Sequence, residues 1–190
     1  MIKKFLFLNL LVSTLLFALT KDEIQPEMTI KINSVLSVLK DSNLTKEAKK
    51  NKIIPIIDPL FDFTLMSRLS LGAKWKELDK GQKDRFTELF TKKLKESYTD
   101  KLYLYTDQKV DILGVDQPKN NRIVLKTQLI GKDDKYDIGY KFYETKDSSW
   151  LIYDVDLLGV SIIQTYRQQF AGFLKDKSFD DLLTNLSTTK

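Results

Sequence analysis

The sequence contains neither cysteine nor histidine. Without cysteine the chain can form no disulfide and has no thiol nucleophile. Without histidine it lacks the imidazole of a Ser-His-Asp triad and the commonest nitrogen ligand of zinc. An all-carboxylate magnesium site or a two-carboxylate glycosidase remains possible in principle, but the Asp and Glu residues mostly sit beside lysines on polar faces. We therefore expect a protein that is not an enzyme and that needs neither a metal nor a cofactor.

The excess of positive charge is also small. The 190 residues include 31 Lys and Arg against 26 Asp and Glu, which gives a net charge of +5. Because the lysines alternate with acidic residues along the chain and form no basic stripe, we expect no binding to nucleic acid. Hydrophobic residues make up 42% of the sequence and aromatic residues 11%. This composition is typical of one globular domain with a sizeable core.

The N-terminus has the pattern of a secretory signal peptide. Two lysines precede an almost wholly apolar run over residues 5–19, which is short for a membrane-spanning helix. We expect residues 1–20 to be the signal peptide, cut after Ala18 or Thr20, and residues 21–190 to form the mature domain. An uncleaved N-terminal anchor is the alternative. Removal of the two lysines lowers the net charge from +5 to +3.

Helical periodicity dominates the first half of the chain and returns at its end. Thr45 is a candidate N-cap, Pro55 and Pro59 are expected to kink or break the helix that follows it, and Gly72 is a candidate C-cap. Asp79 and Gln82 resemble a capping box at the start of a long helix. We expect helices over residues 27–40, 45–58 and 61–71, and further helices beginning at residues 79, 161 and 178.

From residue 109 the apolar period changes to two, which predicts strands. In the stretch 135–144, one face is aromatic and the other is charged or small. Short turns join neighbouring strands, so the sheet should be an antiparallel meander. The expected class is α+β, with N-terminal helices, a long amphipathic helix on a mainly antiparallel four-stranded sheet, and a C-terminal helix. The predicted strands cover residues 109–115, 122–130, 135–144 and 150–158.

Aromatic and aliphatic side chains on the long helix and the strands form the first candidate site. They either fill an ordinary core between helix and sheet or line an apolar cavity, and periodicity does not separate these interpretations. If the cavity is present, the residues that would line it are Phe86, Phe90, Leu94, Tyr98, Tyr105, Leu125, Tyr136, Ile138, Tyr140, Phe142, Ile163 and Phe170.

Two polar constellations lie near the end of the sheet. The stretch from Gly159 to Ser161 passes from a strand into a helix N-terminus, where free N–H groups favour an anion, and Arg167 follows on that helix. The alternative is a capped helix with a solvated arginine. Asp154 and Asp156 share one strand face, so they either bind a metal or act as acid and base, or they simply pair with lysine.

Two blocks of residues resemble one family. The first contains Pro59-Leu60-Phe61-Asp62-Phe63, Met66-Ser67, Leu71-Gly72, Trp75, Gln82, Phe86 and the stretch from Phe90 to Tyr98. The second contains Trp150-Leu151-Ile152-Tyr153-Asp154-Val155, Gly159-Val160-Ser161 and Tyr166-Arg167-Gln168-Gln169-Phe170. In order and spacing these blocks resemble the MlaC (toluene-tolerance) family of periplasmic phospholipid-binding proteins. The resemblance covers roughly residues 28–186.

The resemblance implies a cone-like fold with a curved sheet and a deep pocket for acyl chains. It implies a carrier that moves phospholipid between the MCE-domain protein of an inner-membrane ABC transporter and an outer-membrane lipoprotein–porin complex. The aromatic residues would line the pocket, and Gly159, Val160, Ser161, Tyr166 and Arg167 would lie at its mouth, near the lipid head group. A periplasmic apolar-groove or chaperone-like module for peptides is the main alternative.

Overall fold

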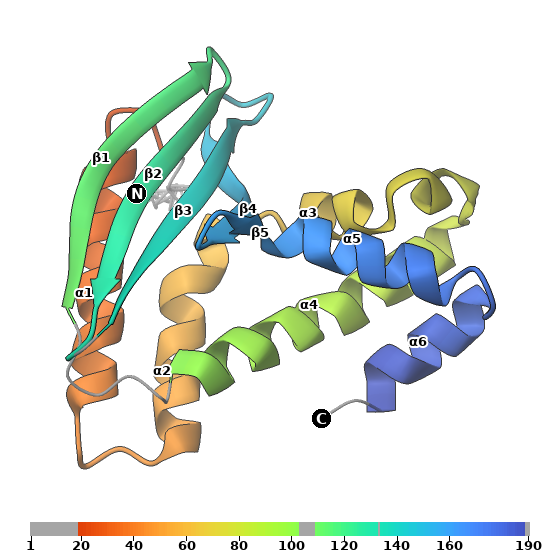
Figure 1. The fold of residues 1–190 in the computed structure, drawn as a ribbon, viewed down its shortest axis with the longest axis horizontal. Coiled ribbons are helices and arrows are strands. Elements are labelled where there is room, and N and C mark those ends of the chain that lie inside the picture. The colour runs from red at the N-terminus through yellow and green to blue at the C-terminus, as the bar shows by residue number, and fades with distance from the viewer. Residues whose placement is uncertain (1–18, 103–108, 133, 189–190) are drawn as a thin grey trace, which may run out of the picture.

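The computed structural model describes residues 19–102, 109–132 and 134–188 (Figure 1). Within these ranges it contains six α-helices and one five-stranded antiparallel sheet. The expected α+β class is therefore confirmed. The helices and strands form two regions that lie side by side in Figure 1. None of the described helices is both long and apolar enough to cross a bilayer.

A helical hairpin opens the described chain. It consists of α1 (Ile24–Lys40) and α2 (Lys46–Ile57). The predicted cap at Thr45 is confirmed, because its side chain accepts the backbone N–H of Ala48 at 3.2 Å. Pro55 does not interrupt α2, which ends two residues later and passes into the short 3-10 helix η1 (Asp58–Leu60). A small separate core between these two helices contains Val35, Leu39 and Ile53.

The other helices pack on one another and form what we call the helical lobe. They are α3 (Phe63–Leu71), the 3-10 helix η2 (Gly72–Glu77), α4 (Lys80–Leu102), α5 (Ile162–Phe173) and α6 (Phe179–Thr188). The predicted capping box opens α4, since Asp79 and Gln82 each accept the backbone N–H of the other, at 2.8 and 3.1 Å. The buried core of this lobe contains Met66, Leu71, Leu78, Phe86, Leu89, Phe90, Leu94, Ile163, Phe170, Phe179, Leu182 and Leu186.

The sheet and α1 form the second region, the sheet lobe. The strands are β1 (Lys109–Lys119), β2 (Arg122–Ile130), β3 (Lys135–Glu144), β4 (Trp150–Leu157) and β5 (Val160–Ser161), paired in chain order. The four predicted strands are present. The fifth is new, and it turns back on β4 through Leu158 and Gly159, both at positive φ. The core of this lobe contains Ile24, Met28, Leu60, Ile123, Leu125, Phe142, Trp150 and Ile152.

The packing of the long helix differs from the expectation. We expected the apolar stripe of α4 to lie on the sheet, but its buried residues share a core with α3, α5 and α6, while α1 packs in the core of the sheet. The two lobes meet near the start of α3. Phe61 packs against both cores, and the backbone N–H of Asp62 donates to the carbonyl oxygen of Ile152 on β4 at 2.9 Å.

Candidate functional site

The inner face of the sheet, the one that packs on α1, is the first candidate site. Strand register places Leu125 opposite Tyr140 and Leu129 opposite Tyr136. Leu125 is fully buried, whereas Tyr136 and Tyr140 are only partly buried. The structure thus brings together, on one face of two neighbouring strands, the part of the predicted pocket set that comes from the sheet: Leu125, Tyr136, Ile138, Tyr140 and Phe142.

The polar groups on this face are neutral hydroxyls. Thr127 is 0% exposed and donates to the backbone carbonyl of Ile138 at 3.3 Å. Burial raises the pKa of Tyr140 to about 12, although a hydrogen bond with Thr127 acts in the opposite direction. The phenol of Tyr140 is therefore uncharged at any physiological pH. An apolar face with buried neutral hydroxyls can accept hydrocarbon without leaving an unpaired charge in contact with it.

The helical part of the predicted pocket set lies in the other lobe. The ring centroids of Phe86, Phe90 and Phe170 are 5.4–5.6 Å from one another, with one stacked and two edge-to-face pairs. Leu94 and Ile163 belong to the same core. These five residues belong to the core of the helical lobe and not to the core of the sheet lobe, so the structure divides the predicted set between the two lobes. Their contact with a ligand stays a prediction.

Tyr98 lies beside η1, the short helix that follows α2. Its hydroxyl donates to Asp58 Oδ1 at 3.2 Å, and Lys95 forms an ion pair with the same carboxylate. Burial and the neighbouring Asp58 raise the pKa of Tyr98. Its hydroxyl is thus engaged in a contact between α4 and η1. The remaining predicted member, Tyr105, lies outside the described residues.

The N-terminus of α5, the predicted anion site, is occupied by a side chain of the protein itself. Ser161 Oγ accepts the backbone N–H of Gln164 at 3.0 Å and donates to Asp154 Oδ2 at 2.6 Å. Asp154 Oδ1 accepts the backbone N–H of Ile163 at 3.1 Å. This carboxylate takes the place that an external anion would take at a helix N-terminus, and its charge disfavours a phosphate there.

Asp154 and Asp156 on β4 both pair with a lysine, which is the simpler of the two interpretations given for them. Lys141 Nζ lies 3.1 Å from Asp154 Oδ2 and 2.7 Å from Asp156 Oδ1. Lys141 was missing from the predicted constellation. The turn alone could not have identified this pair, because its register would set Lys141 opposite Tyr153. A register shift between Lys141 and Phe142 sets Lys141 opposite Asp154 instead. Among the described residues there is no group of three side chains able to hold a metal ion.

The residues predicted at the pocket mouth have contacts in different parts of the structure. The ring of Tyr166 packs edge-on against Phe90 in the helical core, with centroids 5.0 Å apart. The guanidinium of Arg167 lies on Gly72, so close that a Cβ on that glycine would be 2.9 Å from Arg167 Nε. Val160 is 60% exposed at the β4–β5 hairpin. Arg167 and Gly72, which come from the two separate sequence blocks, are thus direct neighbours.

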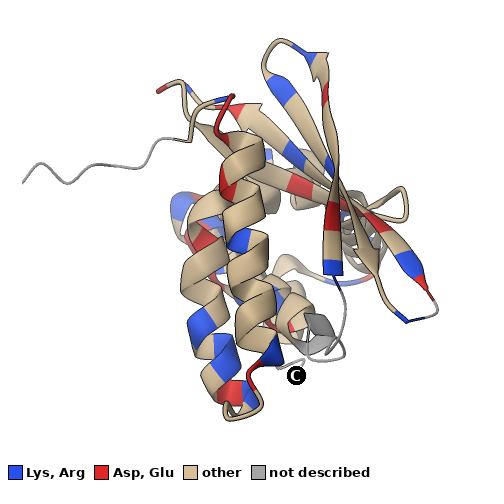
Figure 2. Cartoon of the chain, turned by 90° about the vertical axis from the view of Figure 1, so that its left-hand side faces the viewer, with Lys and Arg blue, Asp and Glu red and all other residues tan. Residues whose placement is uncertain are grey.

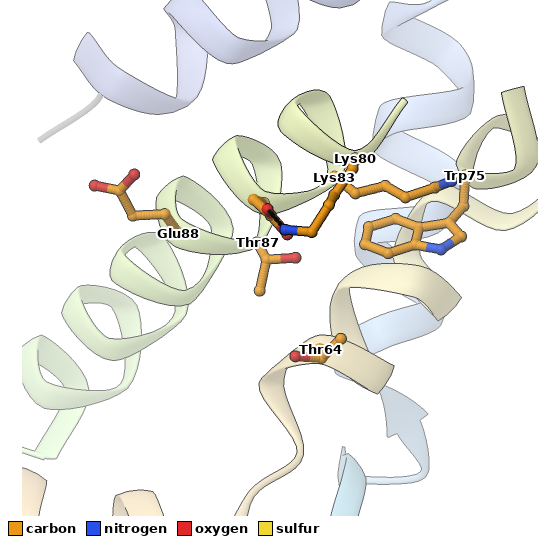
Figure 3. A pocket seen from close by; sticks show the side chains of 7 residues that line it. Thr64, Trp75, Lys80, Lys83, Thr87 and Glu88 are labelled. Atoms are coloured by element: carbon orange, nitrogen blue, oxygen red, sulfur yellow. Dashed lines mark hydrogen bonds and ion pairs between the residues drawn. The ribbon is translucent and has the colours of Figure 1, made fainter. Parts of the chain in front are cut away.

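Hollows in the surface lie away from these residues. One of about 600 Å³ lies between the start of α3, η2 and the start of α4 (Figure 3). There Lys83 Nζ is 6.0 Å from the ring centroid of Trp75, and Lys80 pairs with Asp84. Another, of about 490 Å³, is lined by residues of β1 and β2. Neither hollow is lined by a residue of the predicted pocket or mouth.

Comparisons with known proteins identify a family and a fold. A family model described as MlaC protein matches residues 30–188. The intermembrane phospholipid transport system binding protein MlaC of Haemophilus influenzae is 22% identical over 153 residues, which cover 78% of this chain and 70% of that protein. A phospholipid-binding protein from Ralstonia solanacearum, solved in complex with a phospholipid, superposes with a TM-score of 0.73 at 19% identity. The superposition covers 86% of this chain and 94% of that one, and it confirms the fold.

Proposed function

Because the chain belongs to the MlaC family, we propose that it is a periplasmic phospholipid carrier. The observation that supports the proposal is the family match over residues 30–188, which is nearly all of the described chain. In this proposal residues 1–20 are a signal peptide that directs the chain to the periplasm. The carrier exchanges lipid with an inner-membrane ABC transporter, through its MCE-domain protein, and with an outer-membrane lipoprotein–porin complex.

The physics of the cargo explains why a carrier is needed. A diacyl phospholipid hides some 30 methylene groups from water. At about 0.8 kcal/mol for each, their full exposure costs roughly 20 kcal/mol, so lipid does not cross an aqueous compartment unaided at a useful rate. A protein that covers the chains with apolar surface removes most of this cost. Transfer then becomes nearly isoenergetic, and small differences between docking partners set its direction.

We assign the acyl chains to the inner face of the sheet. Support comes from its apolar side chains, from the neutral phenol of Tyr140, and from the partial burial of Tyr136, Ile138 and Tyr140. The aromatic rings of the helical lobe already have ring partners at normal contact distances. For the head group we retain the exposed hairpin at Gly159 and Val160. The helix N-terminus behind it takes no part in the proposal, because Asp154 occupies it.

The direct test is extraction of lipid from the protein after secretion into a bacterial periplasm. Mass spectrometry of the native preparation should find about one phospholipid for each folded chain. Co-purified peptide in place of lipid would favour the peptide-binding alternative. Protein that carries neither lipid nor peptide, and takes up no lipid from vesicles, would contradict the proposal.

A single substitution tests the assigned face. Tyr140→Glu introduces a charge where the proposal places hydrocarbon, so bound lipid should fall at least tenfold in the fraction that remains folded by circular dichroism. Tyr153→Glu is the matched control. Tyr153 lies on β4 with its ring near Tyr143 and Arg122, away from the inner face, so this variant should keep its lipid. Equal lipid content in both variants would remove Tyr140 from the site.

A further inference from the structure

Positive charge gathers at the loop end of the α1–α2 hairpin. Residues 40–52 include five lysines and two acidic residues, a local charge of +3 in a chain whose total is +5. Figure 2 shows blue segments at the end of α1 and along the first half of α2, on either side of the connecting loop. We call this region the basic tip, and its lysines are Lys40, Lys46, Lys49, Lys50 and Lys52.

Local structure accounts for only part of this charge. Lys49 Nζ donates to the backbone carbonyl of Leu39 at 2.5 Å, which satisfies an acceptor in the last turn of α1. Lys40 and Lys52 are exposed and Lys50 is partly exposed. Within the described part of the chain, none of these last three has a carboxylate oxygen within 4.0 Å. Three lysines thus carry charge that the fold does not neutralise.

We propose that the basic tip binds the anionic surface of a phospholipid bilayer. Charge complementarity supports this occupant, because phosphate head groups form a fluid negative layer that long, flexible ammonium side chains can follow without a fixed geometry. The apolar residues beneath the tip, Val35, Leu39 and Ile53, are buried in their own core, so contact is peripheral. The choice of a bilayer over an acidic protein rests on the proposed carrier function.

The expected strength follows from the number of unpaired lysines. A lysine close to an anionic bilayer contributes about fivefold in affinity, so removal of three should weaken binding roughly a hundredfold. The attraction falls off over a Debye length, which is about 10 Å at 0.1 M salt and about 3 Å at 1 M. Binding should therefore disappear at high salt, whereas insertion of apolar side chains would be largely insensitive to it.

The test uses the full mature chain and sedimentation with vesicles. One set of vesicles is phosphatidylcholine alone and the other contains a minority of phosphatidylglycerol. The tip variant is Lys40→Gln/Lys50→Gln/Lys52→Gln. The matched control, Lys119→Gln/Lys146→Gln/Lys175→Gln, removes the same charge from three exposed lysines elsewhere. Wild type and control should bind the anionic vesicles within about threefold of each other, and the tip variant roughly a hundredfold more weakly.

Three results would overturn the inference. The first is an equal loss of binding in the tip variant and the control, and the second is equal binding of the wild-type chain to both kinds of vesicle. The third is capture of the chain by immobilised polyglutamate without capture by vesicles. The last result would identify an acidic protein as the partner. Lipid content is measured on the same samples. A lipid-loaded chain that ignores anionic vesicles contradicts only the basic tip, and a lipid-free chain that binds them contradicts only the carrier function.

Discussion

The helical lobe and the sheet lobe bury apolar side chains in different ways. In the helical lobe Phe86, Phe90 and Phe170 are buried and in ring contact with one another. On the inner face of the sheet, fully buried Leu125 and Thr127 lie opposite partly buried Tyr140 and Ile138. A closely packed aromatic cluster stabilises a fold but leaves no room for cargo. A half-covered apolar face gives up some of that stability and can take a ligand.

A polar seam holds the two lobes together. Asp62 caps α3 by accepting the backbone N–H of Leu65 at 2.8 Å, and it also accepts a hydrogen bond from the hydroxyl of Tyr143 on β3. Asp154 plays the same double role between β4 and α5. Carboxylates at helix N-termini thus fix the helical lobe on the sheet, and the comparison of the lobes can be tested at three places.

The largest effect is expected in the helical lobe. Phe86→Ala removes a fully buried ring that contacts Phe90, Phe170 and Phe179, so the free energy of unfolding should fall by about 3–5 kcal/mol. Lipid content of the folded fraction should not change. Denaturant unfolding gives the first quantity and lipid extraction the second. Loss of lipid from folded Phe86→Ala would show that this lobe also contacts cargo and would end the division of roles.

The second effect is expected at the seam. Asp154 is 5% exposed and links Lys141, Ser161 and the N-terminus of α5. Burial lowers the pKa of Lys141, but hydrogen bonds and charge from Asp156 and Asp154 outweigh burial and raise it. Asp154→Asn removes a buried charge partner, which should cost about 2–3 kcal/mol of unfolding free energy.

The control for this substitution is Asp156→Asn, because Asp156 contacts the same lysine but is more exposed and does not cap α5. It should cost about 1 kcal/mol or less, measured by the same denaturant unfolding. If the two variants lose equal stability, the deeper burial of the Asp154 charge adds nothing, and both aspartates act only as ion-pair partners of Lys141.

Much of the fold could be predicted because its signals are local. Thr45, and Asp79 with Gln82, predicted helix starts that the structure has, since capping depends on residues three apart. Alternation predicted β2 and β3 to the residue. The partner of α4 could not be predicted, because a stripe shows which face of a helix is buried and not what covers it. α1 also carries an apolar stripe, and its Ile24 and Met28 lie in the core of the sheet lobe.

The candidate site was predicted only in part, because a local pattern shows which residues share a face but not which faces meet. The sheet members of the pocket set came from one alternating pattern, and strand register keeps them on one face. The helical members came from a different stripe and belong to a different core. β5 was missed because Leu158 at φ 53 gives no turn signal; asparagine or glycine is the usual residue in that conformation. The occupied N-terminus of α5 was missed because Asp154 reaches it from a neighbouring strand.

The smallest effect at neutral pH, and the sharpest for the sheet lobe, concerns the hydroxyl of Tyr140. Tyr140→Phe keeps the ring and removes one hydrogen bond with Thr127, so the free energy of unfolding should change by about 1 kcal/mol or less near pH 7. The variant should keep its lipid, because the face stays apolar. Lipid loss here would mean that the hydroxyl, and not the hydrocarbon surface, holds the ligand.

The same substitution has a signature in alkali. The pKa of Tyr140 is raised from 10.0 to about 12 by burial, so the unfolded chain releases this proton before the folded chain does. The contribution of the neutral phenol to the free energy of unfolding is fully present below pH 10 and is lost as the pH rises towards 12. Over this window the free energy of unfolding should fall with pH less steeply in Tyr140→Phe than in wild type. The two slopes should differ by up to about 1.4 kcal/mol per pH unit. Parallel slopes in wild type and variant would mean that water already reaches this phenol, and the inner face would then be too wet to shelter an acyl chain.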